Sequence, residues 1–119
     1  MLGGKPVSKK DIKMIRTKFS FLETNFNFTC INEEDTKFMD VAIITYRNRD
    51  MVILRIEKER GYYTCKILNG NEVVDFMVFI EKLKSNKFNN ADYYGDNGLL
   101  KLAEEVNNNL LIILKSQSN

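Results

Sequence analysis

Three consecutive acidic residues, Glu33, Glu34 and Asp35, form the densest group of chemically useful side chains in this sequence. Carboxylates are the ligands that calcium prefers, but the spaced acidic pattern of a calcium-binding loop is missing. The surrounding stretch, Asn32 to Lys37, is polar throughout, which predicts a solvated acidic loop. Such a loop can steer a partner of opposite charge toward the protein.

The residue types needed for catalysis are scarce. The sequence contains no histidine, which removes Ser-His and Cys-His catalysis and the commonest metal ligand. Cys30 and Cys65 lie in strand-like runs without a CxxC spacing, so we interpret them as buried free thiols; a disulfide would require neighbouring strands. Gly3-Gly4-Lys5 lacks the spacing of a phosphate-binding loop. We therefore expect a non-enzymatic protein with no cofactor and no metal.

Length and charge favour one ordinary globular domain. The 119 residues suit a single domain, 1–119, with frayed tails at 1–7 and 116–119. The net charge of +2 is small and its signs are interspersed, which argues against a dedicated nucleic-acid arm. The apolar run Leu110–Leu114 is far shorter than the roughly 20 residues of a membrane span. No signal peptide is recognisable, and we expect a cytoplasmic protein that does not bind a membrane.

The stretch from Asp40 to Leu68 predicts three strands joined by the short connections RNRD and KERG. Connections this short require antiparallel neighbours. The strand residues alternate between an apolar face and a mixed face, as in a sheet that is covered on one side. The apolar face is predicted to contain Val52, Leu54, Ile56, Tyr63, Cys65 and Ile67, and the mixed face Arg55, Glu57, Tyr62, Thr64 and Lys66.

The flanking segments predict helices that cover this sheet. Apolar residues at helical spacing indicate one helix from Lys9 to about Asn25, capped by Ser8 and Asp11, and FNFTCI (26–31) alternates like a further strand. Glu72–Lys84 is predicted as a helix, with a strand as the alternative for its apolar middle. A polar loop over Ser85–Gly98 precedes the last helix, which Asp96 or Asn97 can cap and Asn107–Asn109 can bend. The predicted fold is α+β: a two-layer sandwich with an N-terminal helix, a four-stranded antiparallel meander and two C-terminal helices.

Three sequence stretches together resemble small bacterial immunity proteins of polymorphic toxin and contact-dependent inhibition systems. They are FSFLETNFNFTC, TYRNRDMVILRIE and RGYYTCKI, followed by two covering helices. The resemblance implies a protein that binds and neutralises one cognate toxin domain, often a nuclease, in the cytoplasm of the producing cell. It implies no catalytic residues. Because inhibitors of basic nucleases are often acidic and this chain is slightly basic, its charge argues against a strongly basic toxin or confines the contact to local acids such as Glu33, Glu34 and Asp35.

Our first hypothesis is therefore a protein that blocks a cognate toxin or another protein partner. Tyr and Arg dominate interface hot spots, so the candidate contact residues are Glu33, Glu34, Asp35, Tyr46, Arg49, Tyr93 and Tyr94. The alternative is a small nucleic-acid-binding module that uses an outer sheet face carrying Tyr46, Tyr62, Arg47, Arg49, Arg55 and Lys66. A secretion chaperone is a further alternative. The identity of the partner and the oligomeric state stay open.

Overall fold

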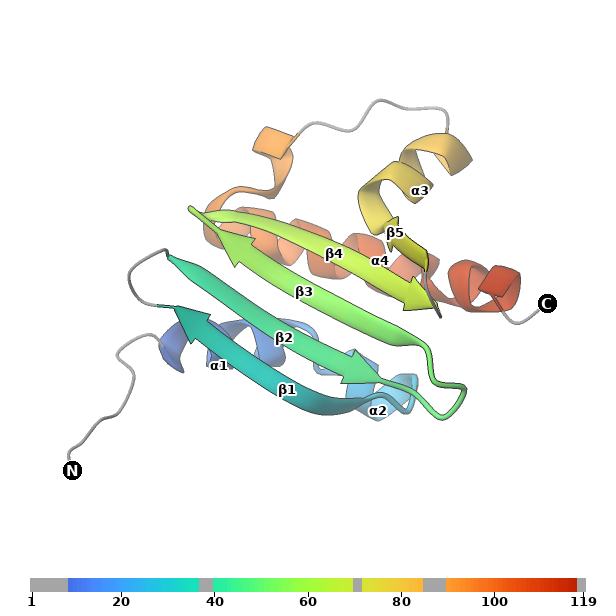
Figure 1. The fold of residues 1–119 in the computed structure, drawn as a ribbon. Helices are drawn as coiled ribbons and strands as arrows, with labels where there is room; N and C mark the ends of the chain where they lie inside the picture. Colours follow the sequence, from blue (N-terminus) through green and yellow to red (C-terminus); the bar gives the residue numbers. More distant parts are fainter. Residues whose placement is uncertain (1–8, 37–39, 70–71, 85–89, 118–119) are drawn as a thin grey trace.

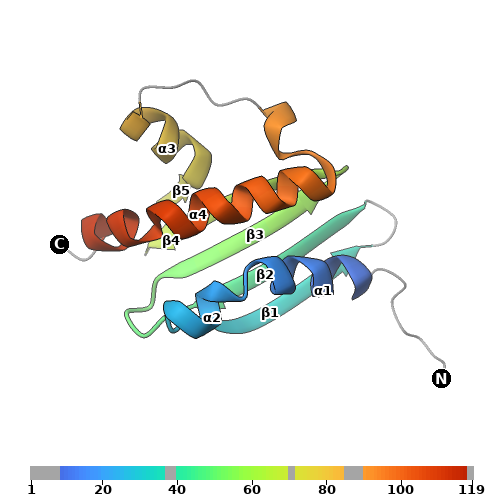
Figure 2. The same cartoon turned by 180° about the vertical axis from the view of Figure 1, so that it is seen from behind.

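The computed structural model describes residues 9–36, 40–69, 72–84 and 90–117, which form a sheet and a layer of helices on one of its faces (Figure 1 and Figure 2). The five strands lie in the order β1-β2-β3-β4-β5, and all neighbours are antiparallel. The predicted α+β class is confirmed, whereas the predicted four strands are corrected to five. The elements are α1 (Lys9–Lys18), α2 (Phe21–Asn25), β1 (Thr29–Thr36), β2 (Val41–Arg47), β3 (Ile53–Glu59), β4 (Tyr62–Asn69), β5 (Glu72–Asp75), α3 (Phe76–Lys84), η2 (Asn90–Tyr93) and α4 (Gly95–Gln117).

The covered face of the sheet forms the core. Alternate residues of β2, β3 and β4 are buried, because α1 and α2 lie over β1 and β2 while α4 lies over β4 on the same face of the sheet (Figure 2). The predicted division of β3 and β4 into an apolar and a mixed face is confirmed. The buried strand residues are Ala42, Ile44, Tyr46, Leu54, Ile56, Tyr63, Cys65 and Ile67.

The first predicted helix is in fact two helices. The chain turns at Phe19–Ser20, where i→i−3 bonds such as Leu22 N to Phe19 O, 3.0 Å, replace the regular α pattern. The predicted apolar positions remain inside, with Phe19 and Leu22 fully buried. Because of the break, α1 and α2 can each pack their apolar side chains against the twisted sheet. The predicted cap at Ser8 lies outside the described residues.

The acidic stretch is a strand, which corrects the predicted loop. Asn32–Thr36 belongs to β1 and pairs in register with β2, whereas the predicted strand over 26–31 contributes only its last residues. Asn27 has a left-handed φ of 59°, and the Phe28 amide donates to the Leu22 carbonyl at 2.9 Å. These two features hold the chain in a turn as far as Phe28. Lys37 lies outside the described residues.

The fifth strand replaces the first turn of a predicted helix. Glu72–Asp75 pairs with the end of β4, and the helix begins only at Phe76. The Asp75 carboxylate marks this boundary, because it accepts hydrogen bonds from the amides of Met77 at 2.8 Å and Val78 at 3.4 Å. This is an N-cap, and it starts the helix four residues later than the apolar spacing indicates.

The last helix is longer and more regular than predicted. It begins at Gly95, continues through Asn107–Asn109 without a break, and ends at Gln117, inside the predicted frayed tail. Buried Asn109 fits the helix because its amide donates to the Glu105 carbonyl at 2.8 Å. The turn η2 lies within the predicted loop; residues 85–89 of that loop are not described. Among the described helices, none has the length and apolar character to cross a membrane.

The connection between β3 and β4 depends on two residues with positive φ. Arg60 has φ 53° and Gly61 has φ 88°, as in the two-residue turns that fit the twist of a hairpin. The Gly61 carbonyl accepts from the Gly95 amide at 2.9 Å, which joins the turn to the start of α4. Tyr94 closes over this contact, and its ring lies 4.9 Å from that of Tyr62.

We predict that Gly61→Ala destabilises the protein by about 2 kcal/mol. A Cβ at this position is strained by the backbone and would lie 2.6 Å from Cε1 of Tyr94, so the exposed ring must move away from Tyr62. Gly95→Ala is the matched control, because it has φ 71° but open space around the added atom. Urea unfolding measures both. Equal losses in the two variants would show that the Tyr94 contact contributes nothing.

Candidate functional site

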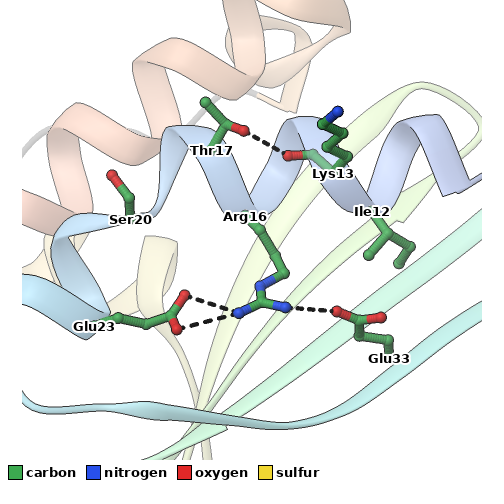
Figure 3. A pocket seen from close by; sticks show the side chains of 7 residues that line it. All are labelled: Ile12, Lys13, Arg16, Thr17, Ser20, Glu23 and Glu33. Carbon is green, nitrogen blue, oxygen red and sulfur yellow. Dashed lines mark hydrogen bonds and ion pairs between the residues drawn. The ribbon is translucent and has the colours of Figure 1, made fainter.

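An ion-pair cluster centred on Arg16 connects the helical layer with the edge of the sheet (Figure 3). One guanidinium nitrogen of Arg16 contacts Glu23 at 3.1 Å, and the other contacts Glu33 at 3.0 Å. The hydrogen bond with Glu23 is the main reason that the pKa of Arg16 is raised. Arg16 is therefore a fixed cation that is shared by α1, α2 and β1.

The break between α1 and α2 makes this cluster possible. Arg16 and Glu23 are seven residues apart, which in an uninterrupted helix means roughly 10 Å along the axis. The turn at Phe19–Ser20 folds the chain back and brings the two charges into contact. Sequence reasoning missed both residues, because it assumed one continuous helix from Lys9 to about Asn25.

A bulge in β1 selects the acid that reaches Arg16. Cys30 pairs with Tyr46 and Asn32 with Thr45, so Ile31 is an extra residue in β1. One inserted residue moves all later side chains to the opposite face. Glu33 consequently points with Cys30 toward the helices, whereas Glu34 points to the uncovered face of the sheet. The three predicted acids thus lie on one strand but on both of its sides.

Two open pockets adjoin the cluster and share Arg16, Glu23 and Glu33. The first, of about 600 Å³, lies against α1 (Figure 3). The second, of about 490 Å³, runs along the first half of β1. We refer to these two pockets together as the Arg16 groove. Its other lining residues are Ile12, Lys13, Thr17, Ser20, Thr29, Cys30, Ile31 and Asn32.

Two reactive groups beside the groove are held in their neutral forms. Burial raises the pKa of the Cys30 thiol, against the opposing effect of Arg16. Burial likewise raises the pKa of Tyr46, with further contributions from Cys30 and Glu23. A neutral thiol is a poor nucleophile. Within the described part of the chain, no group of three or more Cys, Asp or Glu side chains could hold a metal ion.

Tyr46 and Tyr93 occupy different environments from those predicted. Tyr46 pairs with Leu54 on the covered face and is fully buried, because the alternation of β2 directs it inward with Ile44. Its hydroxyl completes no well-formed hydrogen bond with the described residues, although Arg16 lies close enough to lower its pKa. Tyr93 is also buried, which raises its pKa to about 12. Neither ring is exposed on the surface as a contact residue.

Of the other candidate residues, Glu33, Glu34, Arg49 and Tyr94 are exposed and Asp35 is half-buried, and they are not gathered at one place. Arg49 lines a third pocket, of about 390 Å³, in the region of the β2–β3 turn. Tyr94 is 57% exposed and packs on Tyr62 beside the β3–β4 turn. The structure therefore brings Glu33, Glu34 and Asp35 together but does not unite them with Tyr94.

On the uncovered face of the sheet, the charged side chains form ion pairs with one another. Glu57 contacts Arg55 at 2.7 Å and Lys66 at 3.5 Å. Both cations are on the face where they were predicted, together with Tyr62. Because one carboxylate lies between them, their attraction for a phosphate is reduced.

Comparison with protein-family models, with curated proteins and with solved structures found no match to this chain.

We predict that Tyr46→Phe raises the free energy of unfolding by about 1 kcal/mol, because it removes a buried hydroxyl without a partner. The variant should also lose less stability in alkali. The raised folded-state pKa means that Tyr46 keeps its proton after the unfolded residue has ionised near pH 10. Its contribution to stability is thus full below that pH and is lost as the pH rises toward the folded-state pKa.

Urea unfolding of Tyr46→Phe at pH 8 and pH 11 measures both the gain in stability and its pH dependence. Tyr62→Phe is the control, because it removes a hydroxyl from an exposed ring. A destabilised Tyr46→Phe variant would instead show that the hydroxyl has a stabilising partner such as an ordered water.

Proposed function

We propose that this chain is a non-enzymatic protein-binding protein of the immunity type, which neutralises a cognate toxin by covering part of its surface. The observation that carries the proposal is the acidic edge strand β1 with the Arg16 groove beside it. The site offers exposed carboxylates and open pockets, and its nearby thiol is held neutral. These features suit recognition of a basic protein surface rather than chemical turnover.

The local charge supports this function despite the slightly basic chain. The groove and edge carry the carboxylates of Glu23, Glu33, Glu34 and Asp35, against the cations of Lys13 and Arg16. Four negative charges against two positive ones leave a local excess of two negative charges. An acidic patch of this kind accelerates encounter with a basic partner even when the net charge of the protein has the other sign.

We expect this chain to form a stable complex with the product of an adjacent gene and to protect cells from its toxicity. Co-expression followed by co-purification measures the complex, and growth of cells that express the partner measures protection. Glu34→Lys should weaken both effects, because it reverses an exposed charge on β1. Glu104→Lys, which makes the same change on exposed α4, is the control. Loss of co-purification together with no protection would refute the proposal.

The alternative function is binding of single-stranded nucleic acid on the uncovered sheet face. It is supported by the common face of Arg55, Tyr62 and Lys66, and it is weakened by the pairing of both cations with Glu57. It predicts salt-dependent binding of an RNA or DNA oligonucleotide, lost in Arg55→Ala and Tyr62→Ala. Fluorescence anisotropy at low salt measures it, and absence of binding there would remove this alternative.

A further inference from the structure

The outer edge of β1 is the longer of the two sheet edges. β1 has eight residues and, among the described strands, pairs with β2 alone, whereas β5 at the opposite edge has four residues. In Figure 1, β1 is the outermost strand on its side of the sheet. A strand at a sheet edge presents backbone amides and carbonyls that can pair with another extended chain.

The acids on β1 determine which chain can pair with it. Two copies of this protein joined through β1 would bring Glu33, Glu34 and Asp35 near their own counterparts, and opposed like charges destabilise such pairs. A basic segment would instead gain a favourable charge interaction on each face of the strand, since Glu33 points to the helices and Glu34 away from them. The same acids therefore disfavour pairing between two β1 edges and favour a basic segment as the added strand.

If a basic segment were added as a strand beside β1, alternate side chains of that segment would point toward the Arg16 groove. An added strand runs about 4.8 Å beyond β1, and every second side chain faces the helical layer. The pocket along 29–33 lies beside this path and contains the carboxylates of Glu23 and Glu33. A lysine or arginine of the added segment would thus meet two carboxylates and the polar rim of α1.

The buried hydroxyl of Tyr46 indicates how the cluster can accept another cation. Arg16 lies close enough to this hydroxyl to act on its pKa, but no described atom completes a hydrogen bond with it. An incoming cation that bound Glu33 would replace one of the two contacts of Arg16 and free the guanidinium nitrogen that now faces Glu33. That N–H can then donate to the Tyr46 oxygen, so every charge stays paired and the hydroxyl gains a partner.

We propose that the free edge of β1 binds a basic, extended segment of the partner protein as an added strand, with one basic side chain in the Arg16 groove. This inference rests on the proposed protein-binding function and specifies its mode. Backbone pairing provides affinity, and the carboxylates on β1 and in the groove provide specificity.

The test uses a short synthetic peptide in which lysine alternates with valine, and the full-length protein. Fluorescence anisotropy measures binding, and amide hydrogen exchange followed by NMR locates it. We expect protection of β1 amides on binding, and weakening by about tenfold in Glu33→Gln, which removes a groove carboxylate, but not in the exposed-helix control Glu104→Gln. Tyr46→Phe should fold normally and bind the peptide more weakly.

Two further peptides separate strand addition from simple charge attraction. A version with alternate backbone nitrogens methylated keeps every charge but loses the donors for pairing, so it should not bind. A peptide of alternating glutamate and valine should not bind either. Equal binding of the methylated peptide, protection located elsewhere than β1, or no binding of the lysine peptide would each overturn the inference.

The outcome is independent of the test for the proposed function. Peptide binding at β1 without a complex or protection in cells would support the edge site and refute the toxin-neutralising role. A stable complex with the adjacent-gene product in which β1 amides stay unprotected would support the toxin-neutralising role and refute the edge site.

Discussion

The fold depends on burying a single face of an antiparallel meander. Side chains on strands alternate, so one register of β2, β3 and β4 places Ile44, Leu54, Ile56 and their neighbours under the helices and leaves Arg55 and Glu57 outside. Burial of apolar area is the main driving force available to a domain of this size. The helices follow from the same constraint, because each covers part of that face. Even the break at Phe19–Ser20 keeps Phe19 and Leu22 on the core while the chain changes direction.

Local departures from regularity produce the candidate site. A continuous first helix would separate Arg16 from Glu23, and a β1 without its extra residue at Ile31 would point Glu34 rather than Glu33 toward Arg16. Both irregularities lie within one contact cluster that joins α1, α2 and β1. Edge strands commonly contain bulges and charges that discourage unwanted pairing. Here the bulge has a second effect, because it distributes the acids over both faces of the edge.

The sequence predicted the layers well and the site poorly, for a physical reason. The apolar residues in 52–67 alternate with period two, and this alternation follows burial in a sheet that is covered on one face. The prediction of the two faces of β3 and β4 was therefore correct. Polarity misled the prediction at Glu33–Asp35, because a half-exposed edge strand needs few apolar residues and looks like a loop. Asp75 was not recognised as a cap, so the strand before it was assigned to the helix. Tyr46 was predicted on the outer sheet face because tyrosine is common at interface hot spots. The alternation of VAIITYR instead places it on the covered face with Ile44.

The sign of the net charge is a weak guide to the partner of this protein. The chain carries +2 overall, yet its longest free edge combines acids on both faces with a groove that holds only two cations. Electrostatic attraction between proteins acts over about one Debye length, roughly 8 Å at physiological salt. A basic partner docked at β1 would therefore respond mainly to the charges of the edge and the groove. Because an exposed pair in water contributes little, the acids alone would select a basic partner without holding it firmly. Backbone pairing along β1 would provide the remaining affinity, since the described strands leave β1 without a neighbour at this edge.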